Sequence, residues 1–255
     1  MRLDIDIAAE AGSSAIAALD LSALNRDDLR NLILQRSEVM FDRPKSGRVI
    51  KAWNAGDQGP IDGVIDEMGE AIARRAAGVI RAEFRALEPV LRELAPKRIA
   101  DIGCGYALFD LFAAKALKCD LLLIDLESNE RRHFGFAEEG AAYSSLAVAR
   151  KLLEKNKIAK KRIVTLNPRE QAPETAGPVD LAVSFLSCGF HYPVDLYLPF
   201  LDQALAPGGA AIFDLRQAAA EEQAAKLAAF GTLTDLPAPP KARRVLLRKG
   251  GRHDR

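Results

Sequence analysis

The chain is poor in cysteine and tryptophan, and neither charge is in excess. Its 255 residues include three cysteines, Cys104, Cys119 and Cys188, which form no CxxC pair. Zinc sites and disulfide frameworks need closely patterned cysteines, so neither is expected, and we interpret the three thiols as reduced. The 36 Lys and Arg residues against 35 Asp and Glu residues leave a net charge of +1. This balance gives no global attraction toward nucleic acid.

Long apolar runs are missing as well. No window approaches the ~18 apolar residues of a membrane span, and the N-terminal MRLDIDIAAEAG lacks a basic segment followed by an apolar one. Membrane insertion and secretion are therefore not expected, and we predict a cytoplasmic protein. With 255 residues and 49% hydrophobic content, the chain can bury one substantial core with a small helical extension.

The first 95 residues are predicted to be helical. Apolar residues recur at helical spacing in DLRNLILQRSEVM and again in IDGVIDEMGEAIARRAAGVIRAEFRALEPVLREL. Pro89 predicts a break or kink in the second segment, because an interior proline loses a backbone hydrogen bond. The polar connection FDRPKSGRVIKAWNAGDQGP between the two is either a solvated linker or a lid. We expect residues 1–95 to form a helical extension or cap, which could also mediate a homodimer.

From Lys97 onward, short apolar runs alternate with helical segments. The runs RIADIG, CDLLLIDLE, RIVTLN, VDLAVSFLS and AAIFDLR predict a parallel sheet with helices on both faces. The last two runs, GTLTDL and RRVLLRK, are joined by the short polar connector PAPPKA, which permits an antiparallel pair. The fold prediction for residues 96–255 is therefore α/β: a doubly wound, mostly parallel, seven-stranded sheet with an antiparallel C-terminal strand pair.

The segment ADIGCGYALFDLF combines a carboxylate, a glycine turn and the start of a helix. Gly103 and Gly105 allow a tight turn and a close approach of a ligand to the backbone, and the helix N-terminus presents free N–H donors. Asp125 ends the next apolar strand, 24 residues beyond Asp101. A carboxylate at about this offset is typical of a ribose-binding site. The pattern therefore indicates a nucleoside-bearing cofactor.

These motifs resemble those of class I S-adenosylmethionine-dependent methyltransferases, with Ala107 in place of the third glycine of D/E-x-G-x-G-x-G. PVDLAVSFLS resembles the fourth motif of this superfamily, and LAPGGAAIFDLR resembles its Pro-Gly-Gly turn before strand five. The resemblance implies a Rossmann-like methyltransferase domain that uses S-adenosyl-L-methionine as its cofactor. It also implies eight cofactor-binding residues: Asp101, Gly103, Gly105, Tyr106, Asp125, Leu126, Asn167 and Ser184. At Asn167, an ordinary Asn-Pro turn is the equal alternative.

His191 is the first candidate for a catalytic general base. It lies in SCGFHYPVDLY, after the fourth predicted strand, and imidazole can accept a hydroxyl proton near neutral pH. A histidine that only hydrogen-bonds this loop to the sheet is the alternative. No Asn/Asp-Pro-Pro-Tyr/Phe element and no Pro-Cys dipeptide are present. Their absence disfavours methylation of amino-adenine, of the glutamine amide and of cytosine C5, and we expect no metal.

The acceptor favoured by this sequence is a small hydroxylated molecule. Nucleic acid is not favoured, although an rRNA, tRNA or protein methyltransferase is kept as an alternative. Arg131, Arg132 and His133, in the long connection after Asp125, could receive an anionic acceptor. Two other classes also stay open. A methyltransferase-like scaffold or partner subunit would keep the fold without catalysis. A nicotinamide-dependent oxidoreductase is less favoured because Leu108 occupies its third glycine position.

Overall fold

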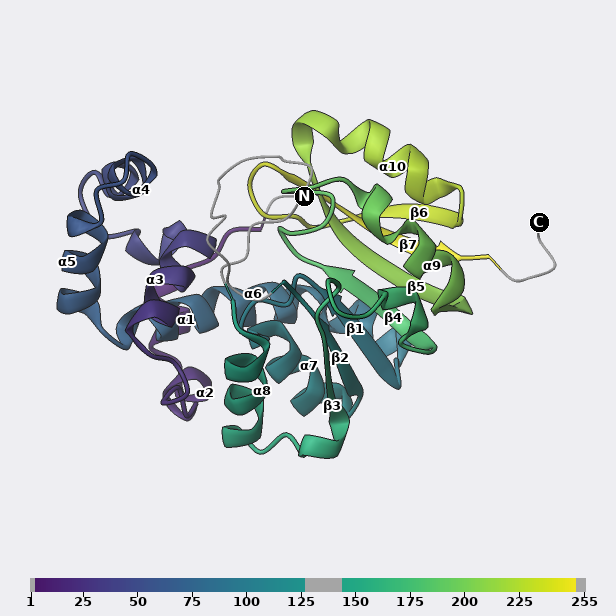
Figure 1. Cartoon of the computed structure of the whole chain (residues 1–255), viewed down its shortest axis with the longest axis horizontal. Coiled ribbons are helices and arrows are strands. Elements are labelled where there is room, and N and C mark those ends of the chain that lie inside the picture. The colour runs from purple at the N-terminus through teal and green to yellow at the C-terminus, as the bar shows by residue number, and fades with distance from the viewer. Residues whose placement is uncertain (1–2, 127–143, 251–255) are drawn as a thin grey trace.

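The computed structural model describes residues 3–126 and 144–250, and its centre is a seven-stranded sheet covered by helices on both faces (Figure 1). The strands are β1 Arg98–Ile102, β2 Asp120–Ile124, β3 Ile163–Leu166, β4 Val179–Ser184, β5 Leu205–Arg216, β6 Gly231–Leu236 and β7 Ala242–Lys249. Their order in the sheet is β3-β2-β1-β4-β5-β7-β6. The first five strands pair in parallel, whereas β7 runs antiparallel to both of its neighbours. This confirms the predicted α/β fold, with the sheet expected from the methyltransferase resemblance.

The helices form two groups along the chain: one precedes the first strand, and the other connects strands of the sheet. The first group is α1 Ile7–Ala11, α2 Ser14–Ala17, α3 Arg26–Gln35, α4 Ser46–Asn54, α5 Gly59–Met68 and α6 Ala71–Leu94. The second group is α7 Leu108–Leu117, α8 Leu146–Lys155, α9 Leu198–Gln203 and α10 Ala220–Ala228. In Figure 1, α3, α4 and α5 extend away from the sheet, and α6 leads back to it. None of the helices in the described ranges is long and apolar enough to cross a membrane.

The central strands are buried on both faces, because their alternate residues enter two different cores. In β2, Leu121 and Leu123 join one cluster with residues of α6, α7 and α8, while Leu122 and Ile124 join the other with residues of α9 and α10. Successive side chains of a strand point to opposite faces. A parallel strand covered on both sides is therefore apolar throughout, as the run LLLI is. The first cluster also includes Leu32 and Ile33 of α3, so the N-terminal helices share a core with the sheet.

Two local features of the N-terminal half differ from what the sequence predicts. The helix does not break at Pro89, because α6 runs unbroken over Ala71–Leu94 and contains this proline. The interruption lies earlier, at Gly69, whose φ of +51° ends α5 and divides the predicted helix in two. Only glycine adopts such backbone angles readily. The polar connection is also more ordered than a linker, since it contains α4, Ser46–Asn54.

The Pro-Gly-Gly segment is not a turn ahead of strand five. It lies inside β5, Leu205–Arg216, where the pairing register with β4 shifts between Val179 and Leu181. Gly208 takes a φ of +74° at this irregularity. The two glycines therefore provide a bulge that bends the strand while its pairing continues.

Two buried ion pairs hold the core together, one between two strands and one between two segments of the N-terminal helical part. Arg244 of β7 binds Asp214 of β5 with Nε–Oδ1 and Nη2–Oδ2 distances of 2.7 and 2.8 Å, and both side chains are fully buried. Arg36, just after α3, binds Glu83 of α6 through Nη1–Oε1 and Nη2–Oε2 contacts of 2.8 and 3.0 Å. Burial lowers the pKa of Arg36, but the Glu83 and Glu38 carboxylates outweigh it and raise that pKa above its usual range. Bidentate geometry offsets the desolvation of such pairs.

Replacing Arg244 in the pair with Asp214 should therefore destabilise the protein strongly. We expect Arg244→Met to lower the free energy of unfolding by about 3–5 kcal/mol, because it leaves Asp214 charged and unpaired in the core. Urea unfolding followed by circular dichroism measures this loss. The matched control is Arg243→Met, because this neighbouring side chain pairs with Asp235 and Glu221 at the surface and should contribute about 0–1 kcal/mol. Equal losses in the two variants would show that the buried pair contributes no more to stability than the surface pair.

Candidate functional site

The turn after β1 is held by contacts with the end of β2. Gly103 N donates to Ile124 O at 2.7 Å, and Gly105 N donates to Asp125 Oδ2 at 2.7 Å. Adjacent parallel strands place their carboxyl ends at the same edge of the sheet, so the residues that follow them meet. The structure thereby brings the predicted glycine turn and the predicted ribose-binding carboxylate into direct contact.

A cavity of about 140 Å³ opens beside this turn, with room for on the order of ten water molecules. Its wall includes six of the predicted site residues: Asp101, Gly103, Gly105, Tyr106, Asp125 and His191. The rest comes from α3 and its C-terminal end, α6, the start of α7, the segment after β4, and the two residues Cys104 and Ser144. The cavity therefore lies where the carboxyl ends of the central strands face the N-terminal helices.

Both glycines of the turn contact protein side chains on the side where a Cβ would be. A Cβ on Gly103 would lie 1.8 Å from Ser187 Oγ, and one on Gly105 would lie 3.2 Å from Gln35 Oε1. Their φ angles are +76° and +56°, so the turn requires glycine for its conformation as well. The sequence predicts glycine here because a ligand approaches the backbone closely. The structure adds a second cause, since the segments that contain Ser187 and Gln35 also approach it closely.

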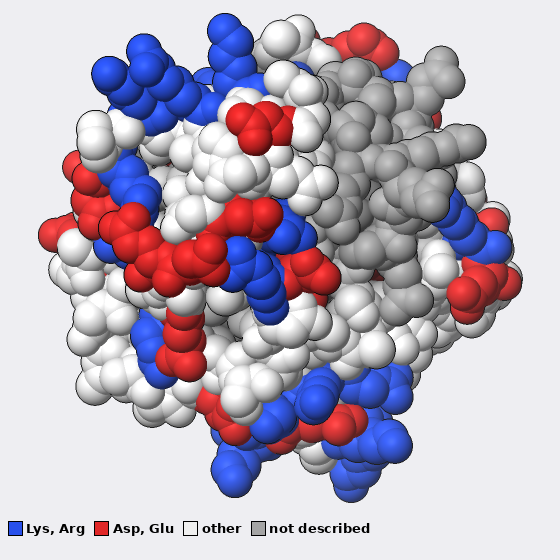
Figure 2. All heavy atoms as spheres, turned by 60° about the vertical axis from the view of Figure 1, so that its left-hand side comes forward, with Lys and Arg blue, Asp and Glu red and all other residues white. Residues whose placement is uncertain are grey.

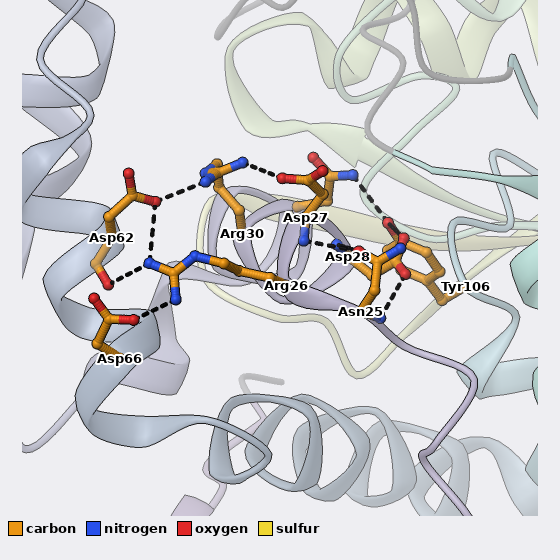
Figure 3. A network of polar contacts seen from close by, with 9 residues as sticks. Asn25, Arg26, Asp27, Asp28, Arg30, Asp62, Asp66 and Tyr106 are labelled. Carbon is orange, nitrogen blue, oxygen red and sulfur yellow. Dashed lines mark hydrogen bonds and ion pairs between the residues drawn. The ribbon is translucent and has the colours of Figure 1, made fainter.

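Tyr106 connects the turn to α3. Its hydroxyl donates to Asp28 Oδ1 at 2.8 Å and accepts from Asn31 Nδ2 at 2.9 Å, and the residue is only 2% exposed. Asp28 is itself part of the capping box that begins α3, since its Oδ2 accepts from Asn25 N at 2.8 Å. Figure 3 shows this network at the turn. The Tyr106 hydroxyl is therefore committed to the helix, although the residue still forms part of the cavity wall.

On its other side, α3 is fixed to α5. Arg30 Nη2 donates to Asp62 Oδ1 at 2.6 Å, and Arg26 pairs with Asp66 (Figure 3). Surface pairs of this kind are worth about 0–1 kcal/mol each. They orient α3 between the turn and the outer helices and contribute little to the total stability.

His191 lies on a tightly bonded loop that enters the cavity. Its backbone N donates to Ser187 O at 2.8 Å, and its ring meets that of Phe190 edge-on at 5.1 Å. Arg216, at the end of β5, donates from Nε to Phe190 O at 2.6 Å. These bonds fix the backbone of the loop, and the Phe190 ring packs against the imidazole at the cavity wall.

The other three predicted cofactor-binding residues lie outside the cavity wall. Leu126 is half-buried just after Asp125. The Asn167 carboxamide turns back on its own loop, since Nδ2 donates to Glu170 and Oδ1 accepts from Arg169 N. Ser184 is fully buried, and its hydroxyl donates to Ile102 O at 2.8 Å and accepts from Cys188 N at 2.9 Å. Ser184 thus ties β4 to β1, and Asn167 forms the Asn-Pro turn considered as its alternative.

Several wall residues were not identified from the sequence. Gln35, Arg36, Glu83 and Phe109 line the cavity together with Ser187. Phe109 contacts Phe185 with ring centroids 4.5 Å apart, and Arg36 and Glu83 form the buried pair described above. The N-terminal members carry no local motif, because only tertiary packing brings α3 and α6 to the turn. Leu186, with a φ of +50°, is the kind of backbone outlier that often marks a functional site.

The candidate lid lies elsewhere. Trp53 is half-buried on α4 and packs against the first core cluster, and neither it nor Arg48 or Lys51 lines the cavity. Arg131, Arg132 and His133 lie outside the described residues.

Comparisons with known proteins find only distant structural likeness. No family model and no curated protein matches the chain. Similar solved structures include an O-methyltransferase family protein from Burkholderia thailandensis, with 11% identity over 70% of this chain and a TM-score of 0.45. A methyltransferase from Pyrococcus furiosus shows 18% identity over 67% of this chain and 83% of its own length, with a TM-score of 0.47. Ribosomal protein L11 methylase from Lactobacillus delbrueckii shows 20% identity over 64% of this chain and 77% of its own length, with a TM-score of 0.46. The matched region spans 61% of the Burkholderia protein.

The bond between Tyr106 and α3 can be tested by removing one oxygen atom. We expect Tyr106→Phe to lower the free energy of unfolding by about 1–3 kcal/mol, because Asp28 and Asn31 lose a buried partner. Tyr197→Phe is the matched control, since Tyr197 is also buried but makes no described hydrogen bond through its hydroxyl. If chemical denaturation gives the two variants the same stability, the network does not anchor α3.

Proposed function

We propose that this protein binds S-adenosyl-L-methionine and transfers its methyl group to an oxygen atom of a small hydroxylated molecule. The observation that carries the proposal is the meeting of Asp101, the glycine turn, Asp125 and His191 around one cavity at the carboxyl edge of the sheet. In open α/β sheets this edge is where ligands bind.

The residues present suit a cofactor that carries a ribose and an amino-acid group. Asp125 is half-buried beside the turn, so its carboxylate is placed to accept hydrogen bonds from ribose hydroxyls. Asp101 lies at the wall, where a cationic ammonium would face it. The cofactor supplies a methyl group activated by a sulfonium centre. The protein's part is to hold acceptor and methyl group in line and to keep water out, and positioning of this kind can supply much of a rate enhancement.

The acceptor is expected in the part of the cavity nearest the N-terminal helices. Its wall there is partly apolar, from Phe109, Phe185 and Ile80, and partly polar, from Gln35 and the Arg36–Glu83 pair. Such a mixture suits a small molecule with a hydrophobic body and hydroxyl groups. Figure 2 shows acidic and basic side chains lying close together on the face of the N-terminal helices. A nucleic-acid surface would instead call for a continuous basic stripe on the side of the molecule that receives the acceptor.

His191 would then accept the proton that the acceptor hydroxyl loses as it attacks the methyl group. The loop bonds at Ser187 and Phe190 fix the imidazole, and a positioned base contributes about 10²–10⁴-fold. A scaffold without catalysis is the second candidate, and it would bind the cofactor without turning over any acceptor.

Cofactor binding is tested first. We expect isothermal titration calorimetry to show binding of S-adenosylmethionine and S-adenosylhomocysteine, and Asp125→Ala to weaken it about 10–100-fold, equivalent to one or two charge-assisted hydrogen bonds. Asp120→Ala is the matched control, because Asp120 begins the same strand at its opposite, exposed end. Binding of NAD alone would point to an oxidoreductase, and binding of no nucleoside would overturn the proposal.

The role of His191 is tested by rate. In a screen of hydroxylated small molecules with radiolabelled methyl donor, we expect His191→Gln to lower kcat about 10²–10⁴-fold and to leave the affinity for S-adenosylhomocysteine unchanged. If the variant keeps its full kcat, His191 is not the general base and has only a structural role in its loop. Cofactor binding without turnover of any acceptor would favour the scaffold.

A further inference from the structure

The N–H groups of the glycine turn are already bonded within the protein. Gly103 N and Cys104 N both donate to Ile124 O, at 2.7 and 3.3 Å. Gly105 N donates to the Asp125 carboxylate at 2.7 Å. A turn between a strand and a helix often binds the negative groups of a ligand through such N–H groups. Because these three are bonded to the end of β2, a negative group in this cavity needs donors from outside the turn.

The charged side chains of the cavity wall are mostly acidic. Asp101, Asp125 and Glu83 contribute three carboxyl groups, and Arg36 is the one Lys or Arg among the described wall residues. Both Nη atoms of Arg36 already donate to Glu83. The cofactor of the proposed function carries an ammonium and a carboxylate on the same carbon atom. Asp101 suits the ammonium, but the carboxylate finds no free cation in the described wall and requires neutral donors near Asp101.

Two hydroxyl groups of the loop after β4 lie against Gly103 and bond to each other. Ser187 Oγ and the Tyr192 hydroxyl oxygen are 3.2 Å apart, and both residues belong to the cavity wall. A Cβ on Gly103 would lie 1.8 Å from Ser187 Oγ and 3.6 Å from the Tyr192 hydroxyl. Gly103 follows Asp101 by two residues, so their Cα atoms are at most about 7 Å apart. The hydroxyl pair therefore lies near the acid that suits the ammonium.

The hydroxyl pair has one proton that its own bond does not use. A hydroxyl carries one proton and can also accept a hydrogen bond, so a bond between two hydroxyls uses one of their two protons. Neither Ser187 Oγ nor the Tyr192 hydroxyl has another hydrogen-bond partner in the parts of the chain that the structure describes. Burial raises the pKa of Tyr192 well above its usual range, so its hydroxyl keeps its proton at neutral pH. The second proton is therefore available to an oxygen atom in the cavity.

The backbone of the loop fixes both residues before a ligand binds. Ser187 O accepts from His191 N at 2.8 Å, and this bond closes the loop behind Ser187. Gly189 N donates to Tyr192 O at 2.7 Å. Leu186 has a φ of +50°, a conformation that costs energy in residues other than glycine. Donors that are fixed in advance lose little conformational freedom when a ligand binds.

We propose that Ser187 and Tyr192 together bind the carboxylate of the cofactor's amino-acid group, donating their free hydroxyl proton to one of its oxygen atoms while Asp101 faces the ammonium. The inference rests on the proposed function, because that function supplies a ligand with an amino-acid group. The group is then recognised from two sides, its cation by an acid and its anion by neutral hydroxyls. The site should therefore discriminate against a ligand that has the ammonium but no carboxylate.

Isothermal titration calorimetry with S-adenosylmethionine and its decarboxylated analogue tests this site. The analogue keeps the nucleoside, the sulfonium and the ammonium, and lacks only the carboxylate. We expect the wild-type protein to bind S-adenosylmethionine about 10–100-fold more tightly than the analogue, as for a hydrogen bond to a charged group. Ser187→Ala and Tyr192→Phe should each weaken S-adenosylmethionine binding about tenfold and change the affinity for the analogue less than about threefold. Tyr197→Phe, at a buried tyrosine outside the cavity wall, is the matched control and should leave both affinities unchanged.

Equal affinity of the wild-type protein for the two ligands would overturn the inference and leave the proposed function standing. This comparison does not depend on how well the variants fold. An equal loss for both ligands in Ser187→Ala would also overturn it, since Ser187 would then shape the turn without binding the carboxylate. If both variants keep their affinity for S-adenosylmethionine but raise the KM of the acceptor, the pair holds the acceptor and the inference is wrong. A wild-type protein that binds neither ligand would instead overturn the proposed function itself.

Discussion

The packing of three chain segments around the turn at residues 103–105 is the constraint on which the rest of the site depends. The end of β2 bonds to the backbone of the turn, Ser187 fills the space beside Gly103, and Gln35 fills the space beside Gly105. None of these segments can shift without the others, because protein interiors are close-packed. The ligand-facing side of the turn is therefore shaped by residues from three separate parts of the chain.

Charge balance explains why this part of the molecule has two different kinds of buried acid. Glu83 and Asp214 each have an arginine partner with bidentate geometry, so they remain ionised and join elements together. Asp101 and Asp110 are also buried, but no Lys or Arg in the described ranges pairs with either of them. A buried carboxylate without a cation is unstable and takes up a proton instead. Of these two acids, Asp101 forms part of the cavity wall, where an external cation can reach it.

The sheet was predictable from the sequence because its signals are local. The apolar run before Asp125 and the alternation of strands with helices specify a buried parallel sheet, and the short connector before β7 permitted its antiparallel pairing. The division of the predicted helix at Gly69 does not follow from the apolar pattern, because it depends on a backbone conformation, φ +51° with ψ −129°, that only glycine adopts readily. Gln35, Arg36 and Glu83 could not be found, since their place at the cavity depends on how α3 and α6 pack against the turn. Ser184 and Asn167 lie at the strand ends that the motifs indicate, but their side chains bond to backbone or to their own loop, which a motif does not reveal.

The bond between Tyr106 and Asp28 spans 78 residues, and it gives the site an order of assembly. During synthesis, the helices before residue 95 leave the ribosome before the strand and turn that they contact, and domains begin to fold as their segments emerge. Asp28 and Asn31 cannot bond to Tyr106 until that residue has been synthesised. The turn likewise reaches its final packing only once Ser187, which follows β4, is present. Contacts of such long range form late in folding, because their loop-closure entropy is met only after local structure exists. The cavity should thus be among the last parts of the molecule to become native, so a nascent chain could not engage a ligand before β4 has been made.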